Sequence, residues 1–171
     1  MHAEAIAETR AWVERVVIGL NLCPFTKAPQ SKGRVCYVVS EATDTDALRR
    51  DLLGELRALS EAPAEQVETT LLIAPQVLQD FDDYNAFLAE ADGAVAELRL
   101  RGVIQVASFH PQYRFAGSEA DDIANATNRS PHPLLHLIRE ASIARDALRK
   151  LSAGTIKGKK VRVHLLQDKA G

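Results

Sequence analysis

The sequence has few cysteines and no long apolar run. Only two of its 171 residues are cysteines, Cys23 and Cys36, and a secreted disulfide scaffold needs more. No apolar stretch reaches the roughly 20 residues that a membrane-spanning helix requires. The first residues carry Glu4, Glu8 and Glu14 instead of the basic start and apolar middle of a signal peptide. We therefore expect a cytoplasmic protein with reduced thiols and no membrane partner.

An excess of charge of one sign is also missing. The chain has 21 basic and 23 acidic side chains, so its formal net charge is −2. A balanced surface exerts no broad attraction on nucleic acid or on an anionic membrane. The basic cluster of Lys157, Lys159 and Lys160 is short enough to be a solvated turn. We expect no nucleic-acid partner, and nothing in the sequence fixes a cofactor or an oligomeric state.

The composition is that of a globular protein, with 46% hydrophobic and 26% charged residues. A chain of this length fits one domain with a sizeable core, so we expect a single domain over residues 1–171. Apolar side chains recur at helical spacing over residues 6–20, which predicts an amphipathic helix that Pro24 ends. The composition of residues 26–33 indicates a loop.

Strand and helix patterns then alternate. β-rich apolar runs at 34–40, 69–74 and 103–109 predict strands. Between them, leucines and aromatics at helical spacing predict two helices, which begin at Thr43 and Asp80 and end near Pro63 and Gly102. This alternation favours parallel strands joined by right-handed crossovers.

Two later segments complete the prediction. Pro131 can begin a long helix that runs to about Lys150, and residues 161–166 resemble a fourth strand. The sequence therefore predicts an α/β fold with a mostly parallel sheet of three to four strands and helices packed on it. The position and direction of the last strand are not readable from the pattern.

The loop after the third predicted strand is the strongest candidate for a functional site. In parallel α/β sheets, ligands bind beyond the carboxyl ends of the strands. Residues 109–130 follow such an end and are rich in aromatic, amide, carboxylate and guanidinium groups. Loops that carry function on a rigid scaffold have this character, and the alternative is a polar surface loop with helix caps.

His110 is the first candidate within this loop. At a strand end it could act as a general acid or base or as a metal ligand, or it could be a structural histidine bonded to the backbone. Asp121 and Asp122 could bind a cation or orient His110. Because Ser118 and Asp121 also fit a helix cap, Asp122 is the better candidate for catalysis.

The predicted long helix suggests an anion site at its start. Ser130 is a natural N-cap with Pro131 at the first helical position, and Arg129 lies beside the free backbone N–H groups. Arg139 could hold the same carboxylate or phosphate. Tyr113, Asn125 and Asn128 would add hydrogen bonds to the substrate.

The same helix would place His132, His136 and Glu140 on one face, four residues apart. Together with His110, His136 and Glu140 could hold a catalytic metal, whereas a solvated polar face is the simpler interpretation. The two cysteines lack the paired spacing of a structural zinc site. With Arg129 and Arg139 close in sequence, we expect no resident transition metal.

Cys23 ends the first helix within the string Asn21-Leu22-Cys23-Pro24-Phe25. It could be a nucleophile if a histidine stabilised its thiolate. A cysteine in such a place is more often a small buried apolar residue, and Cys36 within a strand is predicted to lie in the core.

Three segments together resemble the bacterial family called domain of unknown function 1415. They are residues 19–25 (GLNLCPF), residues 109–115 (FHPQYRF) and residues 127–140 (TNRSPHPLLHLIRE). The resemblance spans nearly the whole chain and implies that these segments are the family's signature and meet in one site. It implies no particular activity or cofactor. The family is expected to have tyrosine where this chain has His132, which weakens His132 as a shared ligand.

The leading hypothesis is an enzyme of the hydrolase or transferase type that acts on a small anionic metabolite, with a site built from residues 109–140 and residues 21–25. His110 would move protons, Asp122 would assist, and Arg129 and Arg139 would hold the anion. One alternative is a binding or regulatory module that uses the same residues without turnover. Another is a divalent-metal enzyme built on His110 and His136.

Overall fold

The computed structural model describes residues 2–18 and 32–152, and its centre is a four-stranded sheet in the order β1-β2-β4-β3. Strands β1 (Val35–Val39) and β2 (Thr69–Ile73) pair in parallel. Strand β4 (Leu134–Arg139) pairs antiparallel with β2 on one side and with β3 (Ile104–Phe109) on the other. The predicted α/β class is confirmed, but the sheet is mixed rather than mostly parallel.

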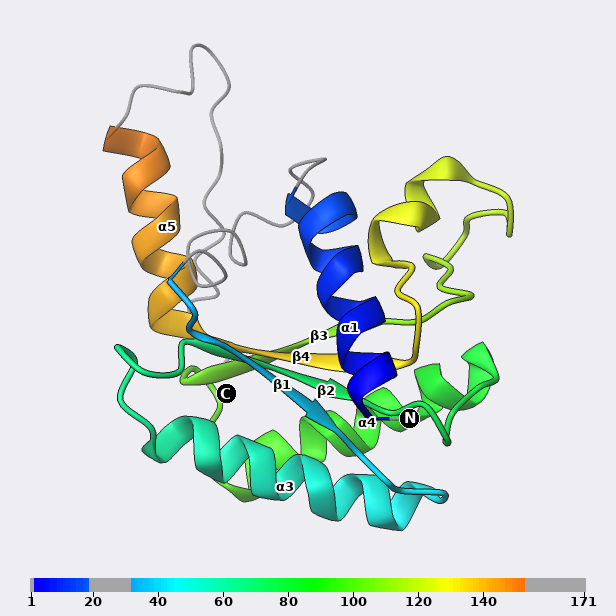
Figure 1. The fold of residues 1–171 in the computed structure, drawn as a ribbon, viewed down its shortest axis with the longest axis horizontal. Coiled ribbons are helices and arrows are strands. Elements are labelled where there is room, and N and C mark those ends of the chain that lie inside the picture. Colours follow the sequence, from blue (N-terminus) through cyan, green and yellow to red (C-terminus); the bar gives the residue numbers. More distant parts are fainter. Residues whose placement is uncertain (1, 19–31, 153–171) are drawn as a thin grey trace.

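Helices cover both faces of the sheet. Helices α3 (Thr45–Glu61) and α4 (Phe81–Glu97) pack on one face, while α1 (His2–Trp12) and α5 (Glu140–Ser152) stand on the other (Figure 1). The segment Val13–Ile18 continues α1 as a π-helix. No helix in the described ranges is long and apolar enough to cross a bilayer.

Local sequence signals explain α3 and α4. Asp44 caps α3 by accepting the Ala47 N–H at 2.7 Å, one residue after the predicted Thr43, and Pro63 follows the helix end. Leucines at positions 48, 52, 56 and 59 form the buried stripe of α3. Asp80 caps α4 as predicted, and Gly102 has the positive φ of 75° that its turn requires.

The predicted helix over residues 131–150 is wrong in its first half. Leu134 to Arg139 form the central strand β4, and the helix begins only at Glu140. The strand is buried on both faces, so its residues form a nearly continuous apolar run, and periodicity cannot distinguish such a run from a buried helix. The predicted strand at 161–166 lies outside the described residues, as do Pro24 and most of the predicted loop at 26–33.

The main core lies between the sheet and the α3–α4 pair. It includes Leu52, Leu72, Phe87 and Leu137, each at most 3% exposed. A smaller cluster beneath α1 joins Trp12 to Phe109, whose rings meet edge to face with centroids 5.4 Å apart. These two layers hold the strand ends in place, which fixes the positions of the loops that follow them.

Candidate functional site

A pocket of about 400 Å³ lies where the loops after β2 and β3 meet. Because β2 and β3 both run antiparallel to β4, their carboxyl ends lie at the same edge of the sheet. This is the edge at which α/β proteins place their ligands. The pocket is lined by Asp80, Phe81, Asp82, Pro111, Gln112, Arg114, Ala120 and Arg129. We call it the edge pocket.

His110 lies beneath the edge pocket and is fully buried. The Gln112 N–H donates to Nδ1 at 3.0 Å, so in the neutral ring Nε2 carries the proton and donates to the Leu78 carbonyl at 2.9 Å. Burial lowers the pKa of the imidazole, which favours this neutral form. Both ring nitrogens are thus occupied by backbone groups, and the contacts are those of a structural histidine.

The bond from His110 also explains an unusual backbone conformation. Leu78 has a φ of 59°, in the left-handed region that residues other than glycine rarely adopt. Its carbonyl accepts from the His110 ring, and its side chain is 8% exposed in the core. His110 therefore joins the loop after β2 to the end of β3, and residues that follow each of these segments line the edge pocket.

Tyr84 of α4 joins the end of β3 to the start of β4. Its hydroxyl donates to the Leu134 carbonyl at 2.7 Å and accepts the Phe109 N–H at 2.9 Å. Leu134 and Phe109 are partners in the β3–β4 register, so the hydroxyl contacts both strands at the last pair of the ladder. Burial raises the pKa of this phenol, which keeps the O–H donor intact. The sequence contains no local signal for this bridge.

The loop above the pocket is braced by its own asparagines. Asn125 is fully buried: its Oδ1 accepts the Phe115 N–H at 2.9 Å, and its Nδ2 donates to the Glu119 carbonyl at 2.8 Å. Asn128 donates from Nδ2 to the Ser108 carbonyl at 2.9 Å. Both were predicted to bind substrate, and in this structure their amides satisfy the loop backbone.

Tyr113 and Asp122 also support the loop. The Tyr113 ring packs against Phe81 and Phe115 with centroid distances of 5.3 and 5.0 Å. Asp122 caps the short 3-10 helix η2 (Ile123–Asn128) by accepting the Ala124 N–H at 2.9 Å. The expectation that Asp121 rather than Asp122 would be the cap is therefore wrong.

Ser130 does not cap a helix, because strand β4 follows it. Its hydroxyl donates to the His132 carbonyl at 2.6 Å and shapes the turn that leads into β4. The predicted anion site at a helix N-terminus beside Arg129 is therefore absent at this position. Arg129 instead lines the edge pocket from the loop between β3 and β4.

Two guanidinium groups line the edge pocket. Arg129 is anchored, because its Nε donates to the Tyr113 carbonyl at 3.3 Å and its Nη2 to the Ala120 carbonyl at 2.5 Å. Arg114 makes no hydrogen bond to another described residue. It lies over the Phe81 ring at 6.0 Å from the centroid, with Nη2 3.7 Å from a carboxylate oxygen of Asp82. The pocket thus contains one guanidinium held by backbone carbonyls, that of Arg129, and one without a hydrogen bond to a described residue, that of Arg114.

The sequence did not single out Arg114, although it lies in the predicted loop. The available signal was an arginine between two aromatic residues, Tyr113 and Phe115, which hold the neighbouring backbone. Such a position allows a guanidinium to project from a fixed base.

The remaining predicted residues lie elsewhere. Arg139 is at the opposite end of β4, facing Ile104, and donates to the carbonyls of Val67 and Ala62. Because β4 runs antiparallel to its neighbours, its last residue lies at the far edge of the sheet from the edge pocket. Arg129 and Arg139 therefore cannot hold one small anion, contrary to the prediction.

His136 lies in the middle of β4, between Leu71 and Ala107. The Thr69 hydroxyl donates to the Leu137 carbonyl at 2.6 Å, so it accepts from His136 Nε2–H, also at 2.6 Å. Complete burial lowers the pKa of this ring to about 4. His136 is thus a neutral histidine within the sheet.

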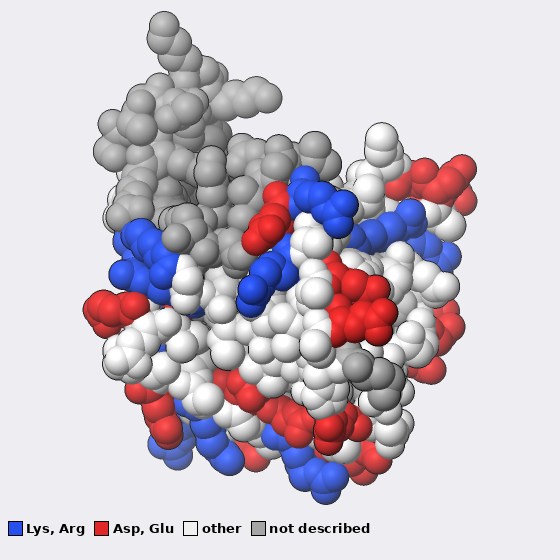
Figure 2. All heavy atoms as spheres, in the orientation of Figure 1, with Lys and Arg blue, Asp and Glu red and all other residues white. Residues whose placement is uncertain are grey.

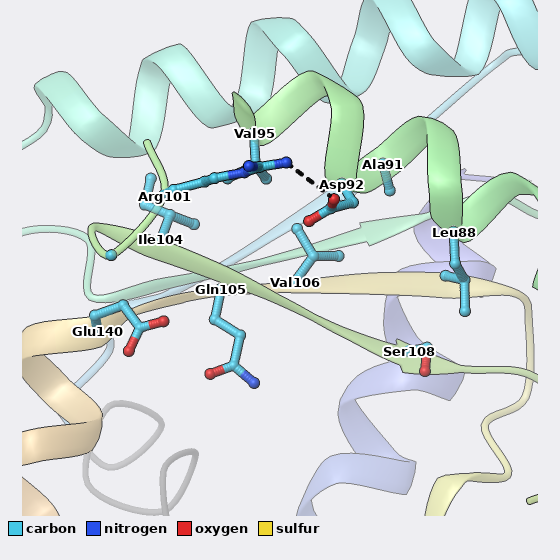
Figure 3. A pocket seen from close by; sticks show the side chains of 11 residues that line it. Leu88, Ala91, Asp92, Val95, Arg101, Ile104, Gln105, Val106, Ser108 and Glu140 are labelled. Atoms are coloured by element: carbon cyan, nitrogen blue, oxygen red, sulfur yellow. Dashed lines mark hydrogen bonds and ion pairs between the residues drawn. The ribbon is translucent and has the colours of Figure 1, made fainter. Parts of the chain in front are cut away.

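Glu140 lines a different hollow, of about 280 Å³, along the outer edge of β3 (Figure 3). There Arg101 and Asp92 form an ion pair at 3.3 Å, while Glu140 and Gln105 lie on the other side of the strand. His110, His136 and Glu140 therefore do not converge. No group of three metal-binding side chains occurs within residues 2–18 and 32–152. Cys23 lies outside those ranges, and Cys36 is half-buried in β1, where burial raises the pKa of its thiol.

The surface charge agrees with the even composition. Acidic and basic side chains are interspersed over the described part of the face in Figure 2. The edge pocket shows the same balance on a small scale, because two arginines and two aspartates line it.

Comparison with known proteins identifies the family. A family model with the description "Protein of unknown function (DUF1415)" matches residues 4–164 of the 171. No curated protein and no solved structure matches the chain.

Proposed function

The chain belongs to the DUF1415 family, whose description assigns no activity, and we propose that it binds a small anionic metabolite in the edge pocket. The observation that carries the proposal is the pair Arg114 and Arg129 at the carboxyl edge of the sheet. Two backbone carbonyls hold the Arg129 side chain in place, and the N–H groups of the Arg114 guanidinium are available to a ligand. Guanidinium forks of this kind are suited to carboxylates and phosphates.

Helix α4 does not supply the anion site. Its first amides are already used, because Asp80 Oδ1 accepts from the N–H groups of Asp82 and Asp83 at 2.8 and 3.1 Å. A bound carboxylate or phosphate would therefore depend on the two arginines. Their removal should then abolish binding instead of weakening it slightly.

An enzymatic reaction at this pocket stays a prediction. His110 offers no free ring nitrogen in this structure, so the carboxylates of Asp80 and Asp82 are the candidate proton acceptors at the pocket wall. Turnover would be of the hydrolase or transferase type expected from the sequence. A location in the cytoplasm likewise stays a prediction.

Replacing Arg114 by glutamine should reduce anion binding at least tenfold, because the anion loses one of its two charged partners. The measurement is titration of ¹⁵N-labelled protein with inorganic phosphate and with a panel of small phosphorylated and dicarboxylate metabolites. In the wild-type protein, the amide signals of Gln112, Arg114 and Ala120 should shift on binding. Arg129 is a poorer target, since its loss would also release the loop.

Arg101→Gln is the matched control. Arg101 is exposed, is paired with Asp92 and lines the hollow along β3 instead of the edge pocket. This variant should bind as the wild type does. If neither an anion of this panel nor a zwitterion with an anionic group shifts the edge-pocket signals, or if Arg101→Gln weakens binding as much as Arg114→Gln, the proposal is wrong.

A further inference from the structure

The edge pocket contains charges of both signs, and this restricts its ligand. Asp80 and Asp82 line it together with Arg114 and Arg129, so the formal charge of its wall is zero. A ligand that carried only negative charge would meet the two carboxylates as well as the two guanidiniums. Repulsion from the carboxylates would offset much of the attraction in so small a volume.

The arginines of the edge pocket are also not held in strong ion pairs with its aspartates. Arg114 and Asp82 approach to 3.7 Å, which is longer than a hydrogen bond, and their side chains are 46% and 84% exposed. Exposed ion pairs of this kind contribute little to stability. A ligand can therefore separate them at small cost and pair with each one. Arg129 bonds only to backbone carbonyls among the described residues, so its charge is not neutralised by a carboxylate contact.

We propose that the ligand of the edge pocket is a zwitterion of the amino acid type, with its anionic group between Arg114 and Arg129 and its ammonium group at Asp82 and Asp80. This inference rests on the proposed function and specifies its ligand class. Phe81, Pro111 and Ala120 supply the apolar part of the lining, against which a short carbon chain packs. The pocket volume of about 400 Å³ is sufficient for a molecule of this size.

Three matched probe sets test the charge pattern. The first contains free α-amino acids, the second their N-acetyl derivatives, which are anions only, and the third their amides, which are cations only. Binding is followed by the amide shifts of Gln112, Arg114 and Ala120 in ¹⁵N-labelled protein. The free amino acid that binds best should bind at least tenfold more tightly than its N-acetyl and amide counterparts.

Asp82→Asn separates the ammonium contact from the anion contact. Asp82 is highly exposed, and its carboxylate caps no helix, whereas Asp80 caps α4 and is left intact. In this variant the preference for the free amino acid over the N-acetyl form should fall at least threefold, because only Asp80 remains to contact the ammonium group, while the N-acetyl form binds at least as tightly as to the wild type. Asp92→Asn, a change at a similarly exposed aspartate in the hollow along β3, should leave the preference unchanged.

The outcomes distinguish this inference from the function on which it rests. If N-acetyl forms or simple phosphorylated anions bind the wild type as tightly as free amino acids, the zwitterion is wrong and anion binding stands. If Asp82→Asn keeps the full preference, the assigned ammonium contact is wrong. If no anionic or zwitterionic probe binds, both the inference and the proposed function are overturned.

Discussion

Replacing Tyr84 by phenylalanine is expected to lower the free energy of unfolding by about 3 kcal/mol, although the ring is retained. The hydroxyl is the hydrogen-bond partner of both the Phe109 N–H and the Leu134 carbonyl. Its removal takes one hydrogen-bond partner from each of two buried backbone groups, and a lost partner at a buried group costs roughly 1–3 kcal/mol. Chemical denaturation gives the loss, and hydrogen exchange at the Phe109 amide shows whether it arises at the last rung of the β3–β4 ladder.

Tyr113→Phe is the control for this experiment. The Tyr113 hydroxyl accepts one bond, from Ser108 Oγ at 3.3 Å, in a half-buried place. Its removal should cost less than about 1 kcal/mol. A loss below 1 kcal/mol for Tyr84→Phe, with the Phe109 amide still protected, would show that a direct bond between the Phe109 N–H and the Leu134 carbonyl is sufficient to hold the two strands. The bridging role would then be wrong.

The second large effect concerns acid. His136 has a folded-state pKa of about 4, depressed by burial, whereas an unfolded histidine titrates near 6.5. Above pH 6.5 the ring is neutral in both states and its contribution to stability is complete. As the pH falls from 6.5 towards 4, the unfolded chain binds the proton first, and stability is lost. At about 1.4 kcal/mol per pKa unit, the total loss is about 3 kcal/mol.

The measurement is the free energy of unfolding between pH 4 and pH 7, for the wild type and for His136→Gln. Glutamine retains an N–H donor for the Thr69 hydroxyl but does not titrate. The difference between the two curves should shrink by about 3 kcal/mol as the pH falls through this range. A constant difference between wild type and His136→Gln would contradict the assignment.

Much of the fold could be predicted because its signals are local. Strands β1, β2 and β3 and helices α3 and α4 each carry a short apolar pattern bounded by a cap, a proline or a glycine. Strand β4 has no such signal. Its side chains are mostly apolar on both faces because it lies at the centre of a sheet that helices cover on both faces, and that position is a property of the assembled sheet.

For the candidate site too, local features could be predicted from the sequence, and features that depend on the assembled fold could not. The sequence could predict that residues 109–130 form an ordered loop at the end of a strand. It could not assign roles, because a long loop needs hydrogen-bond partners for its own backbone. His110, Asn125 and Asn128 serve that need, which leaves the arginines for a ligand. The loss of Arg139 from the site follows from the direction of β4, which no local pattern reveals.

The place of β4 also determines when the sheet can be completed during synthesis. Among the strands that the structure describes, β3 pairs only with β4, and β4 lies later in the chain. Until residues 134–139 have left the ribosome, β1 and β2 can form a parallel ribbon with α3, while β3 has both edges open. Open strand edges are templates for pairing with other chains. The nascent protein is therefore most prone to self-association in the interval between the emergence of β3 and that of β4.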